Sequence, residues 1–70
     1  SNIGTYWERG NQNEIDIVAV NDEAKVMLIA EVKINPKKIN INVLKTKASK
    51  LTTKYNHYDI NYVGYSLKDI

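Results

Sequence analysis

Hydrophobic and polar positions alternate along the first half of the chain and follow a helical period in the second half. Three runs rich in β-branched and aliphatic residues, at 3–9, 14–21 and 26–34, are separated by clusters of turn-forming residues at 10–13 and 22–25. This spacing predicts three consecutive strands joined by short turns. Because the third run is apolar on both of its faces, we expect it to lie in the centre of a sheet.

The second half of the chain begins with a break at 35–38 and continues as an amphipathic helix, which either Asn40 or Asn42 can cap. One apolar stripe recurs at steps of three and four residues, at Ile41, Leu44, Ala48, Leu51 and Tyr55. A last strand at 60–66 contains Gly64, where another segment can approach the backbone closely. The order β-β-β-α-β predicts an α/β domain with a mixed sheet, one crossover helix and a parallel last pair of strands.

The four-residue turn at 22–25 predicts how the second and third strands pair. Side chains alternate between the two faces of a strand, so this turn length places Asp16 opposite Glu31 and on the same face. It also places Glu14 opposite Lys33 on that face. Two opposed carboxylates repel each other, so the first pair needs a neutralising charge.

The turn at 10–13 has the same length and predicts the pairing of the first strand with the second. Arg9 is then opposite Glu14, and Trp7 lies beside Asp16 on the face that carries the acids.

A divalent cation is one group that would neutralise Asp16 and Glu31. Mg²⁺ prefers oxygen ligands and is often held by one or two carboxylates, with waters and phosphate oxygens in the other positions. The carbonyl of Val32 can add a ligand, and Lys33 can orient an attacking water or stabilise charge on a phosphate. The alternative interpretation is an ordinary ion pair between Glu14 and Lys33, with Asp16 at a solvated strand start.

Composition limits the classes of function. The 70 residues carry a net charge of +2, no cysteine and one histidine, which excludes disulfides, thiolate metal sites and multi-histidine zinc sites. No apolar run is long enough to cross a membrane, so we expect a single cytoplasmic domain over residues 1–70.

The charges are unevenly distributed, because residues 32–70 contain eight lysines and only two acids. Such an arrangement suits a polyanion bound beside an acidic pocket. On the helix, Lys47, Lys50 and Lys54 share one face and can contact phosphates, while Trp7 can stack on a base and Arg9 lies nearby on the first strand. The alternative is that the three lysines form the solvated face of a surface helix.

The motifs 14–19 (EIDIVA) and 29–33 (IAEVK) resemble the D…(D/E)-x-K signature of the PD-(D/E)XK nuclease superfamily. Together with 4–7 (GTYW), they are similar to the uncharacterised C-terminal domain found on bacterial and archaeal AAA-type P-loop ATPases. The similarity extends over residues 3–69.

This resemblance implies a restriction-endonuclease-like core that hydrolyses DNA with Mg²⁺ or Mn²⁺. The metal ligands would be Asp16 and Glu31, with Lys33 catalytic and Glu14 an auxiliary acid. It further implies that the chain is a C-terminal fragment. The ATPase module, which binds ATP, and the first helix of the superfamily core would then lie upstream.

Two other functions are compatible with the sequence. The domain can be a catalytically silent interaction domain that docks on its ATPase. It can also be a metal-free nucleic-acid-binding module, whose affinity would fall steeply with salt. Exposed strand edges would additionally allow a homodimer.

Overall fold

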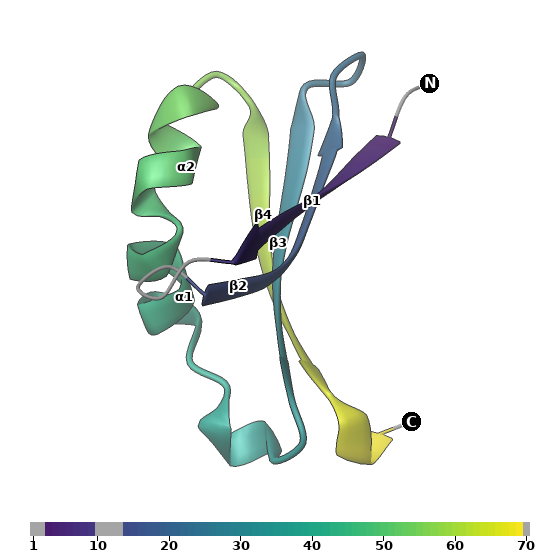
Figure 1. Cartoon of the computed structure of the whole chain (residues 1–70), viewed down its shortest axis with the longest axis vertical. Helices are drawn as coiled ribbons and strands as arrows, with labels where there is room; N and C mark the ends of the chain where they lie inside the picture. The colour runs from purple at the N-terminus through teal and green to yellow at the C-terminus, as the bar shows by residue number, and fades with distance from the viewer. Residues whose placement is uncertain (1–2, 10–13, 70) are drawn as a thin grey trace.

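The computed structural model describes residues 3–9 and 14–69, with side chains from residue 15 to residue 68. The turn predicted at 10–13 lies outside the described residues. The strands form one sheet in the order β1-β2-β3-β4, and helices cover one of its faces (Figure 1). The strands are β1 (Ile3–Arg9), β2 (Glu14–Asn21), β3 (Val26–Lys33) and β4 (Asp59–Ser66).

The sheet is mixed, as the sequence predicts, because β1 and β2 pair antiparallel, β2 and β3 pair antiparallel, and β3 and β4 pair parallel. The crossover from β3 to β4 contains a 3-10 turn (Pro36–Lys38), α1 (Ile41–Lys47) and α2 (Ser49–Lys54). The prediction of one crossover helix is therefore wrong. The helix is divided at Ala48, whose ψ of −2° departs from the usual helical value of about −42°.

Two further observations concern the end of the chain and the length of the helices. A second 3-10 turn, Leu67–Asp69, follows β4. Within the described part of the chain, no helix is long and apolar enough to cross a membrane.

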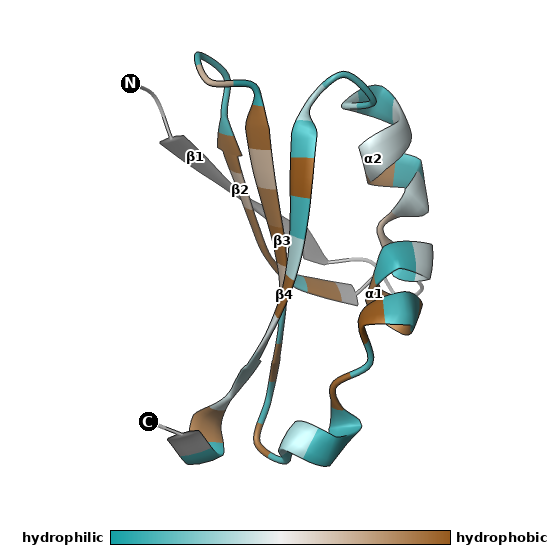
Figure 2. Ribbon diagram, turned by 180° about the vertical axis from the view of Figure 1, so that it is seen from behind, coloured by the Kyte–Doolittle hydropathy of each residue, from teal (hydrophilic) through white to brown (hydrophobic). Residues whose placement is uncertain are grey.

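The hydrophobic core lies between the helices and the face of the sheet toward which they are turned. Its buried members come from β2, β3 and the helical crossover: Ile15, Val18, Met27, Ile29, Leu44 and Ala48. The predicted apolar stripe of the helix is confirmed, because its other members Ile41, Leu51 and Tyr55 pack against this cluster. Figure 2 shows hydrophobic residues concentrated on the two central strands, β2 and β3.

The predicted register of β2 and β3 is confirmed from Asn21 opposite Val26 to Ile17 opposite Ala30. The turn is held by Asn21, whose Oδ1 accepts hydrogen bonds from the amides of residues 23 and 24 at 3.1 and 3.0 Å. Lys25 completes the turn with a φ of 58°.

Tyr58 fastens this turn to the beginning of β4. Its hydroxyl donates a hydrogen bond of 2.7 Å to Asp22 Oδ1, and Lys25 Nζ lies 3.5 Å from the Tyr58 oxygen. The hydrogen bond to Asp22 is the main cause that raises the pKa of Tyr58 above its ordinary value. The amide of Asp59 also donates to the carbonyl of Lys25 at 2.8 Å. These contacts hold together the end of the sheet opposite to the one that carries Glu31 and Lys33.

The predicted register of β1 and β2 is correct only near the turn between them. Glu8 lies opposite Ile15, as predicted, but the register then shifts, so that Tyr6 lies opposite Val18. Two residues of β2 thus occupy the length of one residue of β1, which is a β-bulge. The bulge lets Ile15 and Val18, three positions apart, both enter the core. The regular pairing that would put Trp7 directly beside Asp16 is interrupted by this bulge. The side chain of Trp7, and with it the predicted shared face, lies outside the described residues.

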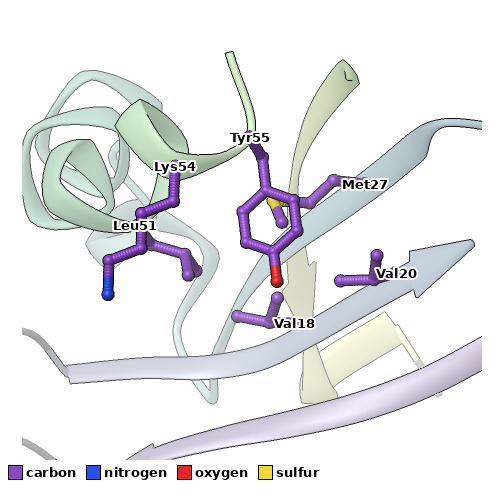
Figure 3. A pocket seen from close by; sticks show the side chains of 6 residues that line it. All are labelled: Val18, Val20, Met27, Leu51, Lys54 and Tyr55. Atoms are coloured by element: carbon purple, nitrogen blue, oxygen red, sulfur yellow. The ribbon is translucent and has the colours of Figure 1, made fainter. Parts of the chain in front are cut away.

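The packing of α2 is looser than that of α1. A hollow of about 170 Å³ remains between part of α2 and the sheet, with Val18, Val20 and Met27 on the sheet side. Figure 3 shows Leu51, Lys54 and Tyr55 bordering it from the other side. No residue of α2 is buried, whereas Leu44 of α1 is fully buried. The position of the helical layer on the sheet is therefore determined mainly by α1.

The structure selects Asn40 as the residue that caps α1. Asn40 has an extended backbone, and its side-chain oxygen accepts a hydrogen bond from the amide of Val43 at 3.1 Å. Asn42 lies within α1 and is exposed.

We therefore expect Asn40→Ala to lower the free energy of unfolding by about 1 kcal/mol, because the amide of Val43 loses its partner. Asn42→Ala is the matched control and should change the stability by less than about 0.5 kcal/mol. Urea denaturation of the two variants measures the difference. Equal losses would show that Asn40 does not act as the cap.

Candidate carboxylate site

Asp16 lies in the bulge of β2, where that strand bends away from β3 (Figure 1). Its Oδ2 accepts a hydrogen bond of 2.7 Å from the amide of Val32. The paired register of β2 with β3 ends at Ile17 and Ala30, two positions before Val32. The carboxylate thus provides an acceptor for a strand amide that β2 no longer pairs. A bond this short to an ionised acceptor belongs to the stronger class of hydrogen bonds.

Glu31 lies on β3 and is buried, with a relative exposure of 4%. Strand alternation places it on the same face as Met27 and Ile29, beneath the beginning of α1. Its Oε1 accepts a hydrogen bond of 3.2 Å from the amide of Asn40, and its Oε2 lies 3.7 Å from the Nζ of Lys47. A buried charge requires such partners, because the desolvation of an unpaired carboxylate is very unfavourable.

The structure brings Asp16 close to the Glu31–Lys33 segment, but not by the predicted strand pairing. Asp16 and Glu31 are not paired in the register of β2 with β3, and neither are Glu14 and Lys33. The physical reason is the bulge, which turns β2 away just before these positions. Asp16 reaches β3 with its side chain instead, and it contacts the residue that follows Glu31.

Of the other predicted site residues, Lys33 lies at the end of β3, and Glu14 and Arg9 lie where β1 and β2 pair. Lys33 is half-buried at the end of β3, and its neighbour on β4 is Ser66. The Ser66 hydroxyl donates to the carbonyl of Ile34 at 3.2 Å, so it holds the two strand ends together. The backbone of Glu14 is paired with that of Arg9, as predicted, and both side chains lie outside the described residues.

The predicted row of three lysines is divided in the structure. Lys50 and Lys54 are exposed on α2, and Lys54 borders the hollow beneath that helix. Lys47 has a side-chain exposure of 29% and contacts Glu31. It therefore belongs to the carboxylate site and not to a solvated face.

Sequence reasoning missed Asn40 and Lys47 as neighbours of Glu31. For Lys47 a signal is present, because it follows Leu44 by three residues and precedes Leu51 by four. That spacing puts its charged side chain on the apolar face of the helix. A lysine in such a position needs an anionic partner on the opposing layer. For Asn40 the sequence indicates only a cap.

The donor atoms at this site suit a hard divalent cation. Asp16 and Glu31 offer carboxylate oxygens, and the ammonium of Lys47 already occupies a cation position beside Glu31. Among the side chains of residues 15–68, no group of three or more His, Cys, Asp or Glu could hold a metal ion. A bound Mg²⁺ would therefore complete its coordination with water, carbonyl or phosphate oxygens, as Mg²⁺ commonly does.

These features define a small α/β domain with a mixed sheet, one helical face and two carboxylates near a bend in β2. The chain belongs to the family DUF234, described as archaea bacterial proteins of unknown function, whose sequence model matches residues 1–51. The match includes β1, β2, β3 and α1, and with them Asp16, Glu31, Lys33 and Lys47. Comparison with curated proteins and with solved structures gave no match.

Proposed function

We propose that this domain is a metal-dependent nuclease with a restriction-endonuclease-like core that cleaves phosphodiester bonds in DNA. In this proposal Asp16 and Glu31 hold Mg²⁺ or Mn²⁺, and Glu14 is an auxiliary acid. The observation that carries the proposal is the 2.7 Å hydrogen bond from the amide of Val32 to Asp16. Val32 lies between Glu31 and Lys33, so this bond brings the Asp16 carboxylate to the backbone of the segment that carries both residues.

Each residue has a defined task in this mechanism. A divalent ion, when bound, supplies a Lewis acid and lowers the pKa of a coordinated water. The amide of Val32 orients Asp16, and the amide of Asn40 orients Glu31. Lys33 follows Glu31 by two positions on β3, and its ammonium stabilises negative charge that develops on the phosphate. In its neutral form Lys33 can instead accept a proton from the attacking water.

The remaining surface suits the proposed substrate and partners. Lys50 and Lys54 are exposed on α2 and contact DNA phosphates in this proposal, with Trp7 and Arg9 as further contacts. An upstream AAA-type ATPase in the same cytoplasmic protein is the proposed partner and binds the ATP. The outer edges of β1 and β4 offer unpaired backbone groups to a second copy.

A second candidate function is a catalytically silent interaction domain that docks on the ATPase. The observation that favours it is the environment of Glu31, which is buried and has partners from within the chain, Asn40 and Lys47. In that case the two acids contribute to the fold only. Metal binding distinguishes the two functions.

For the nuclease we expect Mn²⁺ binding in calorimetry that disappears in Asp16→Asn and Glu31→Gln. Both substitutions retain an oxygen that accepts the backbone hydrogen bond, so the fold should persist while the anionic ligand is lost. Lys33→Ala should still bind Mn²⁺ and should lose cleavage of duplex DNA.

Asp59→Asn is the matched control, because Asp59 is an exposed acid at the opposite end of the sheet. It should bind Mn²⁺ like the unchanged chain. Circular dichroism confirms that every variant is folded. A folded, unchanged chain that binds no Mn²⁺ would contradict the nuclease and favour the interaction domain.

A further inference from the structure

The ammonium of Lys47 lies beside the carboxylate of Glu31. Its Nζ lies 3.7 Å from Glu31 Oε2, while Glu31 Oε1 accepts the amide hydrogen of Asn40. The two oxygens of Glu31 thus have different partners, a fixed backbone amide and a movable ammonium. Of these two, only the ammonium competes with another cation for the carboxylate.

The distance between Lys47 and Glu31 indicates that another cation can replace the Lys47 ammonium. A charge-assisted hydrogen bond is typically about 2.7–2.9 Å long, so the separation of 3.7 Å corresponds to electrostatic attraction without a close hydrogen bond. A divalent ion carries twice the charge, and Mg²⁺ approaches its oxygen ligands to about 2.0–2.1 Å. It would therefore attract Glu31 more strongly than the ammonium does.

The difference in burial between the two side chains also favours the displacement of Lys47 by a metal ion. The side chain of Glu31 has 6% exposure, whereas that of Lys47 has 29% exposure and carries its ammonium on a flexible four-carbon stem. When a metal ion takes the carboxylate, Lys47 is the member of the pair that can move into water. Its ammonium then stays near the site, where a substrate phosphate would be bound.

We propose that Lys47 is the resident counter-cation of Glu31 and that a divalent ion displaces it, so that Lys47 sets the metal affinity of the site. This inference rests on the proposed function, because it requires that Glu31 is a metal ligand. It removes Lys47 from the row of lysines on the helix surface and makes it a regulator of the carboxylate site.

The test compares Mn²⁺ binding in Lys47→Met, Lys47→Arg and Lys50→Met by calorimetry. Methionine retains an apolar stem of similar length and removes the charge, so Lys47→Met should bind Mn²⁺ roughly two- to fivefold more tightly, as expected for the loss of one competing ion pair. Lys50→Met makes the same charge change at an exposed position of α2 and should stay near the unchanged affinity. Lys47→Arg should bind no more tightly than the unchanged chain.

Thermal unfolding supplies a second measurement that does not require activity. Without metal, Lys47→Met should melt at a lower temperature, because Glu31 is left buried without a counter-ion. Mn²⁺ should then raise its melting temperature by more than that of the unchanged chain, since a tighter ligand stabilises the folded state more. A purely structural role of Lys47 would lower the melting temperature without tightening Mn²⁺ binding.

The outcomes separate this inference from the proposed function. If the unchanged chain binds Mn²⁺ and Lys47→Met binds it equally or more weakly, the role of Lys47 is refuted and the metal site stands. If neither folded protein binds Mn²⁺, the metal site itself is refuted, and the inference with it. If Lys50→Met tightens binding as much as Lys47→Met, net charge and not competition explains the effect, which also refutes the inference.

Discussion

Leu44→Ala is expected to lower the free energy of unfolding by about 2–5 kcal/mol, the largest effect of any substitution considered for this chain. Leu44 is fully buried, and it belongs to the core cluster formed with β2 and β3. Removing its side chain eliminates apolar contact and leaves a cavity. A 70-residue domain has a total stability of roughly 4–10 kcal/mol, so a large share of it would be lost.

The same substitution should disturb the carboxylate site, because Leu44 anchors the helix that carries its partners. Asn40 lies at the beginning of α1 and Lys47 at its end, and both contact Glu31. Urea denaturation measures the stability, with Val43→Ala as the matched control. Val43 is the preceding residue in α1 and is 45% exposed, so Val43→Ala should lower the free energy of unfolding much less than Leu44→Ala does. Equal losses in the two variants would show that α1 does not pack against the sheet through Leu44.

Gly64→Ala is expected to lower the free energy of unfolding by about 1–3 kcal/mol through overpacking. A Cβ atom at position 64 would overlap with Cγ2 of Ile39. The sign of this prediction is informative, because alanine is ordinarily favoured over glycine inside a strand by roughly 0.5–1 kcal/mol. The backbone of Gly64 does not have a positive φ, so alanine is compatible with its conformation. The Ile39 side chain alone makes the substitution unfavourable.

The double variant Gly64→Ala with Ile39→Ala tests this explanation. Ile39→Ala removes the methyl group that meets the new Cβ, so in that background Gly64→Ala should be neutral or stabilising. A thermodynamic cycle over the four proteins measures the coupling. If Gly64→Ala costs the same free energy with and without Ile39, the close approach is not the cause. Gly64 lies beside Glu31 in the parallel pair, so this contact also shapes the wall of the carboxylate site.

Much of the fold could be predicted from the sequence, since it depends on interactions between residues near each other in the chain. The four-residue turn after Asn21 determines the register of β2 with β3, and the stripe containing Leu44 and Ala48 predicts the face by which the helical layer packs. Close approach to Gly64 was also predicted, and it is confirmed by the position of Ile39. The choice between Asn40 and Asn42 as the cap needed the structure, because the two asparagines lie on either side of Ile41, the first residue of the stripe.

The candidate site shows where such reasoning fails. Alternation along β2 assumes a regular strand, and it predicts Asp16 directly opposite Glu31. The core requires both Ile15 and Val18 on one face, and the bulge that satisfies this requirement changes the direction of β2. Asp16 consequently meets the amide of Val32 through its side chain.

The sequence by itself determined the strands, the amphipathic crossover, the central position of β3 and the acidic and basic residues available for chemistry. These follow from periodicity and turn length, which are local properties of the chain. Only the tertiary structure decided that Lys47 faces Glu31, sixteen positions earlier, and that the amide of Asn40 completes the environment of that carboxylate. Contacts of this kind arise when the helical layer is packed onto the sheet, since burial of Glu31 then selects the cation and the amide that can reach it.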